Sequence, residues 1–178
     1  MTKALLIGPA PTLKNDLLKI KEKYDIVCGI NSVFIKEMQD ILSDCNIELT
    51  NYYFSDYLYA RQSDKIKSFR CKRKIIIAPL QKMIPKVTTE FEICDQNIVD
   101  TINHIGGYSV GTWATTGMLS LGHLLYSEKV DFVKICGFTF GEGKLHLYDD
   151  VKLDTTRHSI NKEKNIYNFF HKKNKCST

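Results

Sequence analysis

The sequence predicts an α/β protein with a mostly parallel, Rossmann-like sheet flanked by helices. Short apolar runs, typical of buried strands, alternate along the chain with segments whose apolar residues recur at helical spacing. The 178 residues, 43% hydrophobic and 25% charged, suit one globular domain with one continuous core. We therefore expect a single domain over residues 1–172 and a flexible tail over residues 173–178.

Glycine and proline divide the first half of the chain into elements. The run KALLIG ends at Gly8 and Pro9 and predicts a buried strand. The next segment predicts a helix because Leu13, Leu17 and Ile20 fall on one helical face. A second helix is expected over residues 32–45, and further strands over residues 25–30, 51–60, 73–80 and 88–95.

The second half predicts a loop, two helices and one more strand. A glycine- and threonine-rich loop leads into a helix within residues 106–128, and a buried strand follows within 129–141. The last helix is expected over residues 159–172, with Ser159 as its N-cap.

The charge pattern selects no partner by itself. The net charge of +5 suits an anionic small ligand, a nucleic acid or an acidic surface equally. Residues 61–74 hold seven basic residues but only one aromatic residue, whereas a nucleic-acid site would interleave the two. We interpret this segment as a solvated loop or sheet edge and expect no nucleic-acid partner.

The six cysteines predict neither a disulfide nor a zinc site. They are widely spaced, form no C-x-x-C pair, and several lie in apolar runs, where free cysteine behaves as a small hydrophobe. The start of the chain lacks the long apolar region of a signal peptide, and no stretch approaches the ~20 apolar residues of a membrane span. We expect a soluble protein in the reducing cytoplasm.

Ligands of such sheets bind in the loops beyond the carboxyl ends of the strands. In the segment ATTG, Thr115 or Thr116 can cap the next helix, whose free amides attract a phosphate, and Gly117 allows close approach. G-x-G-x-x-G and G-x-x-x-x-G-K-[ST] are absent, and so is D-x-D, because Asp149 and Asp150 are adjacent. These absences argue against the commonest nucleotide-binding families and against a metal-dependent mechanism.

Two histidines are candidates for chemistry, although each has an ordinary alternative as a surface residue. His146 lies in the loop segment LHLYDD. His158 stands just before the last helix, whose positive end favours the neutral imidazole that a general base needs. Glu163 follows five residues later, about 140° around the helix, so direct pairing with His158 is not assured. Glu163 would otherwise orient a neighbouring loop or bond to backbone.

In this order, the segments resemble the animal-type sialyltransferases, glycosyltransferase family 29. The small motif of that family resembles the stretch from ATTG to GFTFG, its third motif resembles HLYD, and its last, H-x-x-x-x-E, matches HSINKE. The large motif is similar in outline to ALLIGPAPTL followed by YDIVCGINS. A bacterial sialyltransferase family opens with a comparable turn, so that segment alone does not separate the two families.

The resemblance implies a small, soluble, metal-independent and inverting glycosyltransferase with a variant GT-A-like fold and no cofactor. It would transfer sialic acid from CMP-sialic acid to a glycan hydroxyl. His158 would be the general base and Glu163 part of the catalytic group, while His146 would stabilise the departing phosphate. The donor contacts implied are Gly8, Asn31, Ser32, Thr115, Thr116, Gly117, Gly137, Phe138 and Tyr148.

The sequence departs from the family and leaves alternatives open. Pro9 stands where the family has asparagine, which puts one donor contact in doubt, and the cysteine of the family disulfide has no counterpart. The donor could be another CMP-linked acidic sugar such as Kdo. The chain could also be a catalytically silent nucleotide- or glycan-binding domain. A methyltransferase or other Rossmann enzyme is disfavoured, because its glycine-rich first loop and the acidic residue after its second strand are absent.

Overall fold

A seven-stranded sheet in which every pair of neighbouring strands is parallel forms the centre of the molecule. The computed structural model describes residues 1–30, 35–77, 91–138 and 159–178. In spatial order the strands are β5 (Glu92–Ile93), β4 (Arg73–Ile77), β3 (Asn51–Ser55), β2 (Ile26–Ile30), β1 (Lys3–Ile7), β6 (Phe132–Cys136) and β7 (Cys176–Ser177). The predicted α/β class with a parallel sheet is confirmed.

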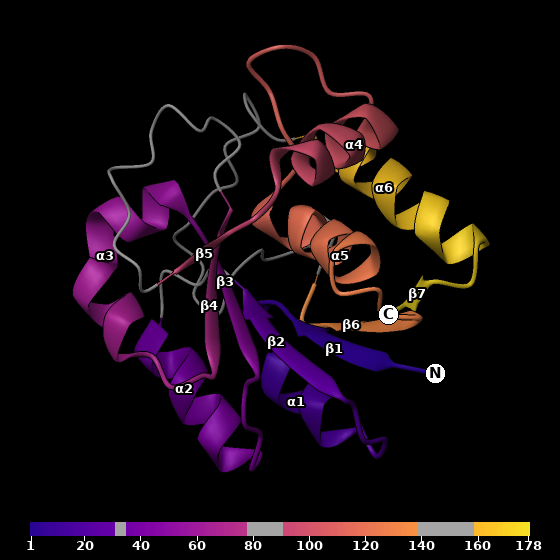
Figure 1. Ribbon diagram of the computed structural model, residues 1–178. Coiled ribbons are helices and arrows are strands. Elements are labelled where there is room, and N and C mark those ends of the chain that lie inside the picture. Colours follow the sequence, from indigo (N-terminus) through magenta and orange to yellow (C-terminus); the bar gives the residue numbers. More distant parts are fainter. Residues whose placement is uncertain (31–34, 78–90, 139–158) are drawn as a thin grey trace.

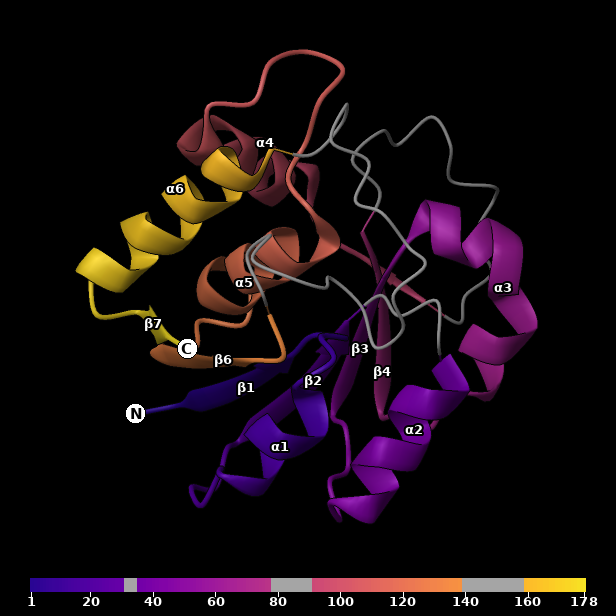
Figure 2. The same ribbon diagram turned by 180° about the vertical axis from the view of Figure 1, so that it is seen from behind.

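Helices cover both faces of this sheet (Figures 1 and 2). Leu5 and Ile7 of β1 pack in one core with the helices of one layer, whereas Ala4 and Leu6 point to the opposite core, as strand alternation requires. The first layer contains α1 (Leu13–Leu18), α2 (Ile35–Asp44) and α3 (Asp56–Ser68). The second contains α4 (Gln96–Gly106), α5 (Thr116–Tyr126) and α6 (Ile160–Lys172).

Strand order reverses between β1 and β6. From β1 the chain fills the sheet outward through β2, β3, β4 and β5, and it then returns to place β6 and β7 on the other side. At such a switch point the loops after the two strands turn toward opposite faces, which opens a ligand crevice at their carboxyl ends. In this sheet that point lies after Ile7 and Cys136.

Helix α3 occupies residues for which the sequence predicted a long strand and a solvated basic segment. Strand β3 ends at Ser55, whose hydroxyl accepts a hydrogen bond from the Leu58 amide (3.1 Å) and so begins α3. The aromatic residues after Ser55 favour a strand by composition, but they lie on this helix. Residues 61–74 form most of α3 and the start of β4, so the loop-or-edge interpretation was wrong for most of this segment.

Helix α4 was not predicted, although its ends carry clear signals. The Asp95 side chain accepts a hydrogen bond from the Asn97 amide (2.8 Å) at the start of the helix. Gly107 ends it in the left-handed conformation, with φ of 72°, which is the usual role of glycine after a helix. Val99 and Ile102 are fully buried and supply the apolar face.

The last residues form a strand, whereas the sequence predicted a flexible tail over 173–178. Cys176 and Ser177 pair with Val133 and Lys134 of β6, and the Val133 amide donates to the Lys175 carbonyl (2.9 Å). Cys176 is 1% exposed, because its small side chain reaches the core beneath α6. Two residues carry too little periodic pattern for a strand to be read from sequence.

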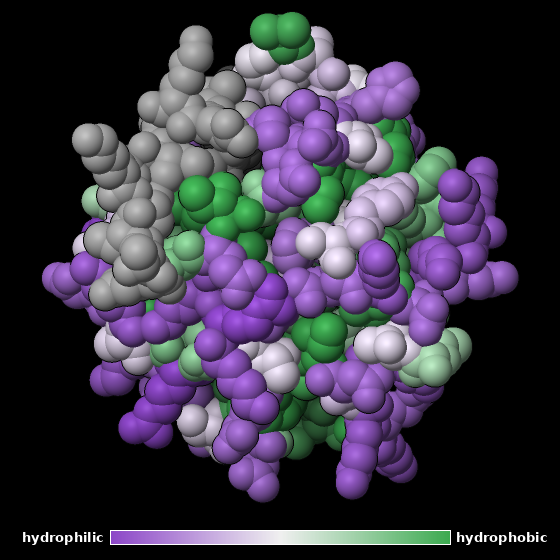
Figure 3. Space-filling view, in the orientation of Figure 1, coloured by the Kyte–Doolittle hydropathy of each residue, from purple (hydrophilic) through white to green (hydrophobic). Residues whose placement is uncertain are grey.

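The surface and the cysteines are those of a typical globular protein. All six cysteines are free thiols, and four of them are buried. Hydrophilic side chains cover much of the face shown in Figure 3, with hydrophobic groups exposed between them. Among the described residues, no helix is both long enough and apolar enough to cross a membrane.

Candidate functional site

The loops after β1 and β6 are pressed together at the switch point. The Gly8 amide donates to the Cys136 carbonyl (2.8 Å), and the Ala10 amide donates to the Gly137 carbonyl (3.0 Å). A Cβ atom on Gly8 would lie 2.5 Å from the Gly137 carbonyl oxygen, so no larger residue fits. Pro9 lies between the two donors, so its lack of an N–H removes neither hydrogen bond.

Helix α5 begins beside these loops. A Cβ atom on Gly117 would lie 2.5 Å from the Phe138 ring, and one on Gly8 would lie 2.8 Å from the same ring. Phe138 therefore packs between Gly8 and Gly117. The sequence predicts that the missing side chain of Gly117 allows a phosphate to approach closely. In the structure, the groups that lie close to Gly117 are the Phe138 ring and Ile30.

Glu163 joins the start of α6 to the start of α5. Its carboxylate, 6% exposed, accepts hydrogen bonds from the amide of Thr115 (2.9 Å), the hydroxyl of Thr115 (2.7 Å) and the hydroxyl of Tyr108. Its place in the first turn of α6 favours its negative charge. Burial, and then the nearby carboxylate, raise the pKa of Tyr108 above its usual range. We call Glu163, Tyr108 and Thr115 the clasp.

The clasp changes the roles expected of two capping residues. Thr115 and Ser159 stand at the N-cap positions of α5 and α6, but neither side chain caps its helix. The Thr115 hydroxyl donates to Glu163 instead. Glu163 therefore bonds to backbone and to a neighbouring loop, which is the alternative that its helical position had left open.

The predicted site residues fall into three groups. Gly8 lies against Gly137 and Phe138, Gly117 lies against Phe138, and Thr115 and Thr116 open the adjoining helix α5. Glu163 reaches this group through Thr115. The remaining predicted residues, Asn31, Ser32, His146, Tyr148 and His158, lie outside the described residues.

Two contributors to this region were missed by sequence reasoning. Tyr108 belongs to the clasp, and the Asn103 side chain accepts a hydrogen bond from the Ala114 amide (2.8 Å), which holds the chain just before Thr115. Asn103 could have been placed if α4 had been recognised. Tyr108 stands in an ordinary glycine- and serine-containing loop that carries no signal for a buried hydroxyl.

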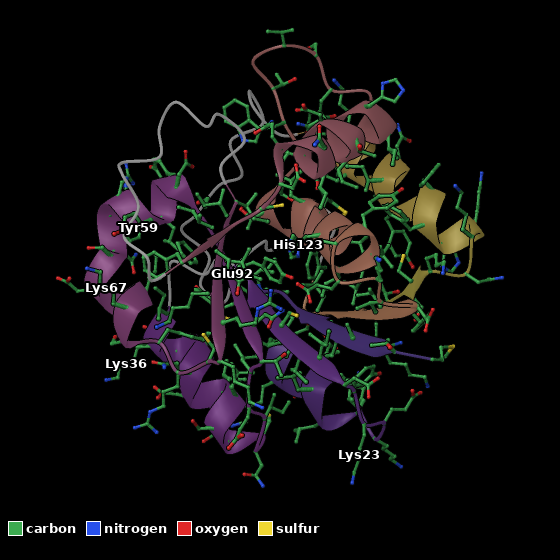
Figure 4. The ribbon with its side chains drawn as sticks, viewed as in Figure 1. Lys23, Lys36, Tyr59, Lys67, Glu92 and His123 are labelled. Carbon is green, nitrogen blue, oxygen red and sulfur yellow. The ribbon has the colours of Figure 1, made fainter. Side chains whose placement is uncertain are left out.

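A second polar cluster lies between α5 and the sheet, away from the clasp. Nδ1 of the buried His123 is 3.0 Å from the Tyr53 hydroxyl. Arg73 makes two hydrogen bonds each to Glu92 and Glu128, and Figure 4 shows His123 and Glu92 in this region. Burial is the main cause that lowers the pKa of His123. Its surroundings therefore favour a neutral, structural imidazole.

Metal ligands do not gather in the described part of the chain. No group of three or more histidine, cysteine, aspartate or glutamate side chains there could hold a metal ion. What the described region offers is backbone amides at the start of α5, a close-packed glycine pair and one buried carboxylate.

Comparison with known proteins gives a match in structure but not in sequence. No family model and no curated protein matches this chain. The sialyltransferase CstII from Campylobacter jejuni, in complex with the substrate analogue CMP-3FNeuAc, has a TM-score of 0.63 and 12% identity, over 99% of this chain and 81% of that chain. The sialyltransferase CST-II in complex with a trisaccharide acceptor and CMP has a TM-score of 0.62 and 12% identity, over 98% and 80%.

These matches bear on fold and on family differently. They agree with the Rossmann-like, GT-A-like architecture predicted from the sequence. The sequence motifs resembled the animal-type sialyltransferases, but the structural similarity is to a bacterial sialyltransferase and does not single out the animal-type family. At this identity the likeness is one of fold, and this chain has the fold of a sialyltransferase.

Proposed function

We propose that this chain is a sialyltransferase-like glycosyltransferase that transfers sialic acid from CMP-sialic acid to a glycan hydroxyl. The observation that carries the proposal is the meeting of Gly8, Gly137, Phe138 and the start of α5 at the sheet's switch point. This meeting occurs in a fold shared with a sialyltransferase whose structure holds CMP-3FNeuAc. Nucleotides are the usual ligands of switch points in such sheets.

The start of α5 is the proposed site of the donor phosphate. The helix dipole and the first-turn amides of Thr116 and Gly117 would attract a single phosphate. The Thr115 amide is already bonded to Glu163, so it would not contribute. Gly8, Gly137 and Phe138 would border the nucleotide, together with Asn31, Ser32 and Tyr148. His146 would stabilise the phosphate as CMP departs.

His158 is the proposed general base. It would accept the proton of the acceptor hydroxyl while the oxygen attacks the anomeric carbon opposite CMP, with inversion of configuration. Ser159, the next residue, lies against the clasp, because the Tyr108 hydroxyl is 3.5 Å from its carbonyl oxygen. Within this proposal Glu163 positions the start of α6 and does not transfer a proton itself.

A thermal-stability panel tests the donor class. CMP and CMP-sialic acid would be compared with UDP, GDP, NAD and S-adenosylmethionine. EDTA would be present to remove divalent metal ions, so that any binding observed does not depend on them. A ligand at 100 times its dissociation constant should stabilise the fold by about 2.7 kcal/mol, which is several degrees for a domain of this size. Stabilisation by S-adenosylmethionine, or none by cytidine monophosphates, would overturn the proposal.

Two further arms separate the alternatives. Stabilisation by CMP-Kdo that exceeds stabilisation by CMP-sialic acid would move the donor to another CMP-linked acidic sugar. Binding of CMP without release of CMP from the donor sugar, with or without glycans, would identify a silent domain of the same fold.

A further inference from the structure

An open cavity of about 280 Å³ lies between α4 and the loop that leads to α5. In Figure 1 this loop arches above the end of α4. The cavity is lined mainly by polar and aromatic residues, among them Asn103, His104, Tyr108, Ser109, Thr112 and Trp113.

The walls of the cavity are fixed by local structure. Gly107 ends α4 with φ of 72°, and Gly111 has φ of 85°. The Thr112 amide donates to the Ser109 carbonyl (3.0 Å), and this bond with Gly111 in third position makes residues 109–112 a type II turn. A wall held in this way need not be ordered when a ligand binds, which favours affinity.

Both ends of the loop are tied to neighbouring elements. Tyr108 at its start donates to Glu163 on α6, and Ala114 at its end donates to Asn103 on α4. Trp113 precedes Thr115 by two residues, so their Cα atoms lie within about 7 Å. The cavity therefore adjoins the start of α5, where the donor phosphate is proposed.

The lining has the chemistry of a polyhydroxyl ligand. The half-buried Trp113 supplies an aromatic ring for the apolar C–H face of a sugar ring, whereas the Tyr108 ring packs against Gly106 and has Lys162 over it at 5.0 Å. The hydroxyl, amide and imidazole groups of Ser109, Asn103 and His104 can donate to and accept from sugar hydroxyls. Among the described residues that line the cavity there is neither lysine nor arginine, and Asp100 adds a carboxylate, which together disfavour a phosphate or nucleotide.

The tip of the loop extends this surface outward. Val110, the second residue of the turn, is fully exposed, and Figure 3 shows a hydrophobic group at the top of the molecule above this loop. An exposed apolar residue at the rim could contact a second sugar of an oligosaccharide.

We propose that this cavity is a saccharide-binding subsite that receives the acceptor glycan. The assignment of the bound saccharide as the acceptor rests on the proposed function, because an acceptor must lie next to the donor. Ring stacking on Trp113 and hydrogen bonds to His104 and Ser109 would then contribute to the choice of acceptor.

The only tryptophan of the chain, Trp113, makes the cavity directly observable. The full chain would be titrated with lactose, and separately with sialyllactose, while tryptophan emission is recorded with and without CMP. We expect a saturable change in emission with at least one of the saccharides. His104→Ala removes an exposed side chain of α4 and should weaken that saccharide about tenfold.

Two controls make the experiment decisive. Tyr57→Ala removes an exposed aromatic residue from α3, in the other helix layer, and should leave saccharide affinity unchanged. Sorbitol, a polyol without a ring, should leave the emission unchanged. An equal response to sorbitol, or no saturable response to either saccharide up to about 100 mM, would overturn the subsite.

The outcomes separate this proposal from the proposed function. Stabilisation by cytidine monophosphates together with an unresponsive Trp113 would leave the donor assignment standing and overturn the subsite. A saccharide response without any cytidine effect would support the saccharide site and overturn the transferase.

Discussion

Glu163 is one buried carboxylate that holds two segments distant in sequence. It bonds to Thr115 and Tyr108, which precede it by 48 and 55 residues. Such a carboxylate can have one of two roles. Its negative charge can take part in the chemistry, or its oxygens can serve only as hydrogen-bond acceptors that position neighbouring groups. The geometry favours the second, since the Thr115 amide, the Thr115 hydroxyl and the Tyr108 hydroxyl all donate to it.

Substitution at Glu163 separates these roles. In Glu163→Gln the amide oxygen can replace Oε1, and the Thr115 hydroxyl can rotate to accept from the new NH₂ group. We expect a loss of about 1 kcal/mol in unfolding free energy for Gln, and about 3 kcal/mol for Ala, which leaves the Thr115 amide without its partner. Urea unfolding and sialyl transfer would be measured together.

The control for Glu163 is Glu48→Gln, which changes an exposed carboxylate. It should alter neither stability nor transfer. If Glu163→Gln keeps its stability but loses transfer to the same extent as Glu163→Ala, the carboxylate has a catalytic role beyond positioning.

His158 is the residue on which the mechanism depends most. We expect His158→Ala to lower the rate of transfer by about 10²–10⁴-fold, the usual contribution of a general base. CMP should bind almost as before, because the base acts on the acceptor. Calorimetric titration with CMP and a transfer assay would check both parts, and unchanged turnover would remove His158 from the mechanism.

His123 predicts a dependence of stability on pH. Burial lowers the pKa of His123 in the folded protein, whereas the unfolded side chain titrates near its ordinary value of about 6.5. The unfolded state therefore binds more protons, and stability should fall as the pH drops below about 6.5, by at most about 1.4 kcal/mol per pH unit.

The control is His123→Asn, whose amide group can still form a hydrogen bond with the Tyr53 hydroxyl. Melting temperatures between pH 5 and pH 7.5 would be compared. The variant should have a flatter profile than the natural protein, and parallel profiles would show that other groups cause the pH effect.

Helix α5 contains two glycines, one facing the candidate site and the other facing α4, and substituting each tests the role of its side of the helix. A Cβ atom at Gly117 would overlap the Phe138 ring, and one at Gly122 would overlap Ile102 of α4. Overpacking of this kind costs about 1–3 kcal/mol, so both alanine variants should be less stable in urea.

Only one of the two glycines belongs to the candidate site. The proposed donor site adjoins Gly117, so Gly117→Ala should also reduce stabilisation by CMP. Gly122→Ala serves as the matched control, because it strains the same helix on its α4 side and should leave CMP binding intact. Equal CMP binding by both variants would place the nucleotide away from Phe138.

The elements show why sequence patterns recover some of this fold and not the rest. KALLIG and RKIIIAPL contain continuous apolar runs, which are typical of strands buried on both faces of a sheet. Helix α3 was not predicted because its aromatic residues favour strands. The helix begins where the Ser55 hydroxyl caps it, and one serine is too weak a pattern to predict a helix start. Strand β7 has two residues and depends on β6 for its pairing.

The candidate site was recoverable in part for a similar reason. Glycines that end strands mark close approach, and Gly8 and Gly137 meet as that rule requires. The clasp could not be derived, because helical periodicity places Glu163 on a face but does not name the residues opposite it. Tyr108 reaches Glu163 only through the path of a loop after α4.

The molecule as a whole has two hydrophobic cores separated by one sheet. Because β1, β2, β3, β4 and β6 each contribute side chains to both cores, loss of either core should destabilise the other. We expect residues 1–178 to unfold as a single cooperative unit. Urea curves from Trp113 emission, which reports the α4–α6 layer, should coincide with those from far-UV circular dichroism. An earlier fluorescence transition would show that this layer unfolds separately.

Strand β1 is made early but stands near the middle of the sheet, with β6 on one side. A ribosome adding about 5–20 residues per second needs roughly 6–25 s to travel from Ile7 to Phe132. During that interval the nascent chain can pair β1 with β2 but leaves its other edge open to neighbours. The order of strands thus exposes newly made chains to aggregation, and chaperones that cover apolar segments should raise the yield of this protein in cells.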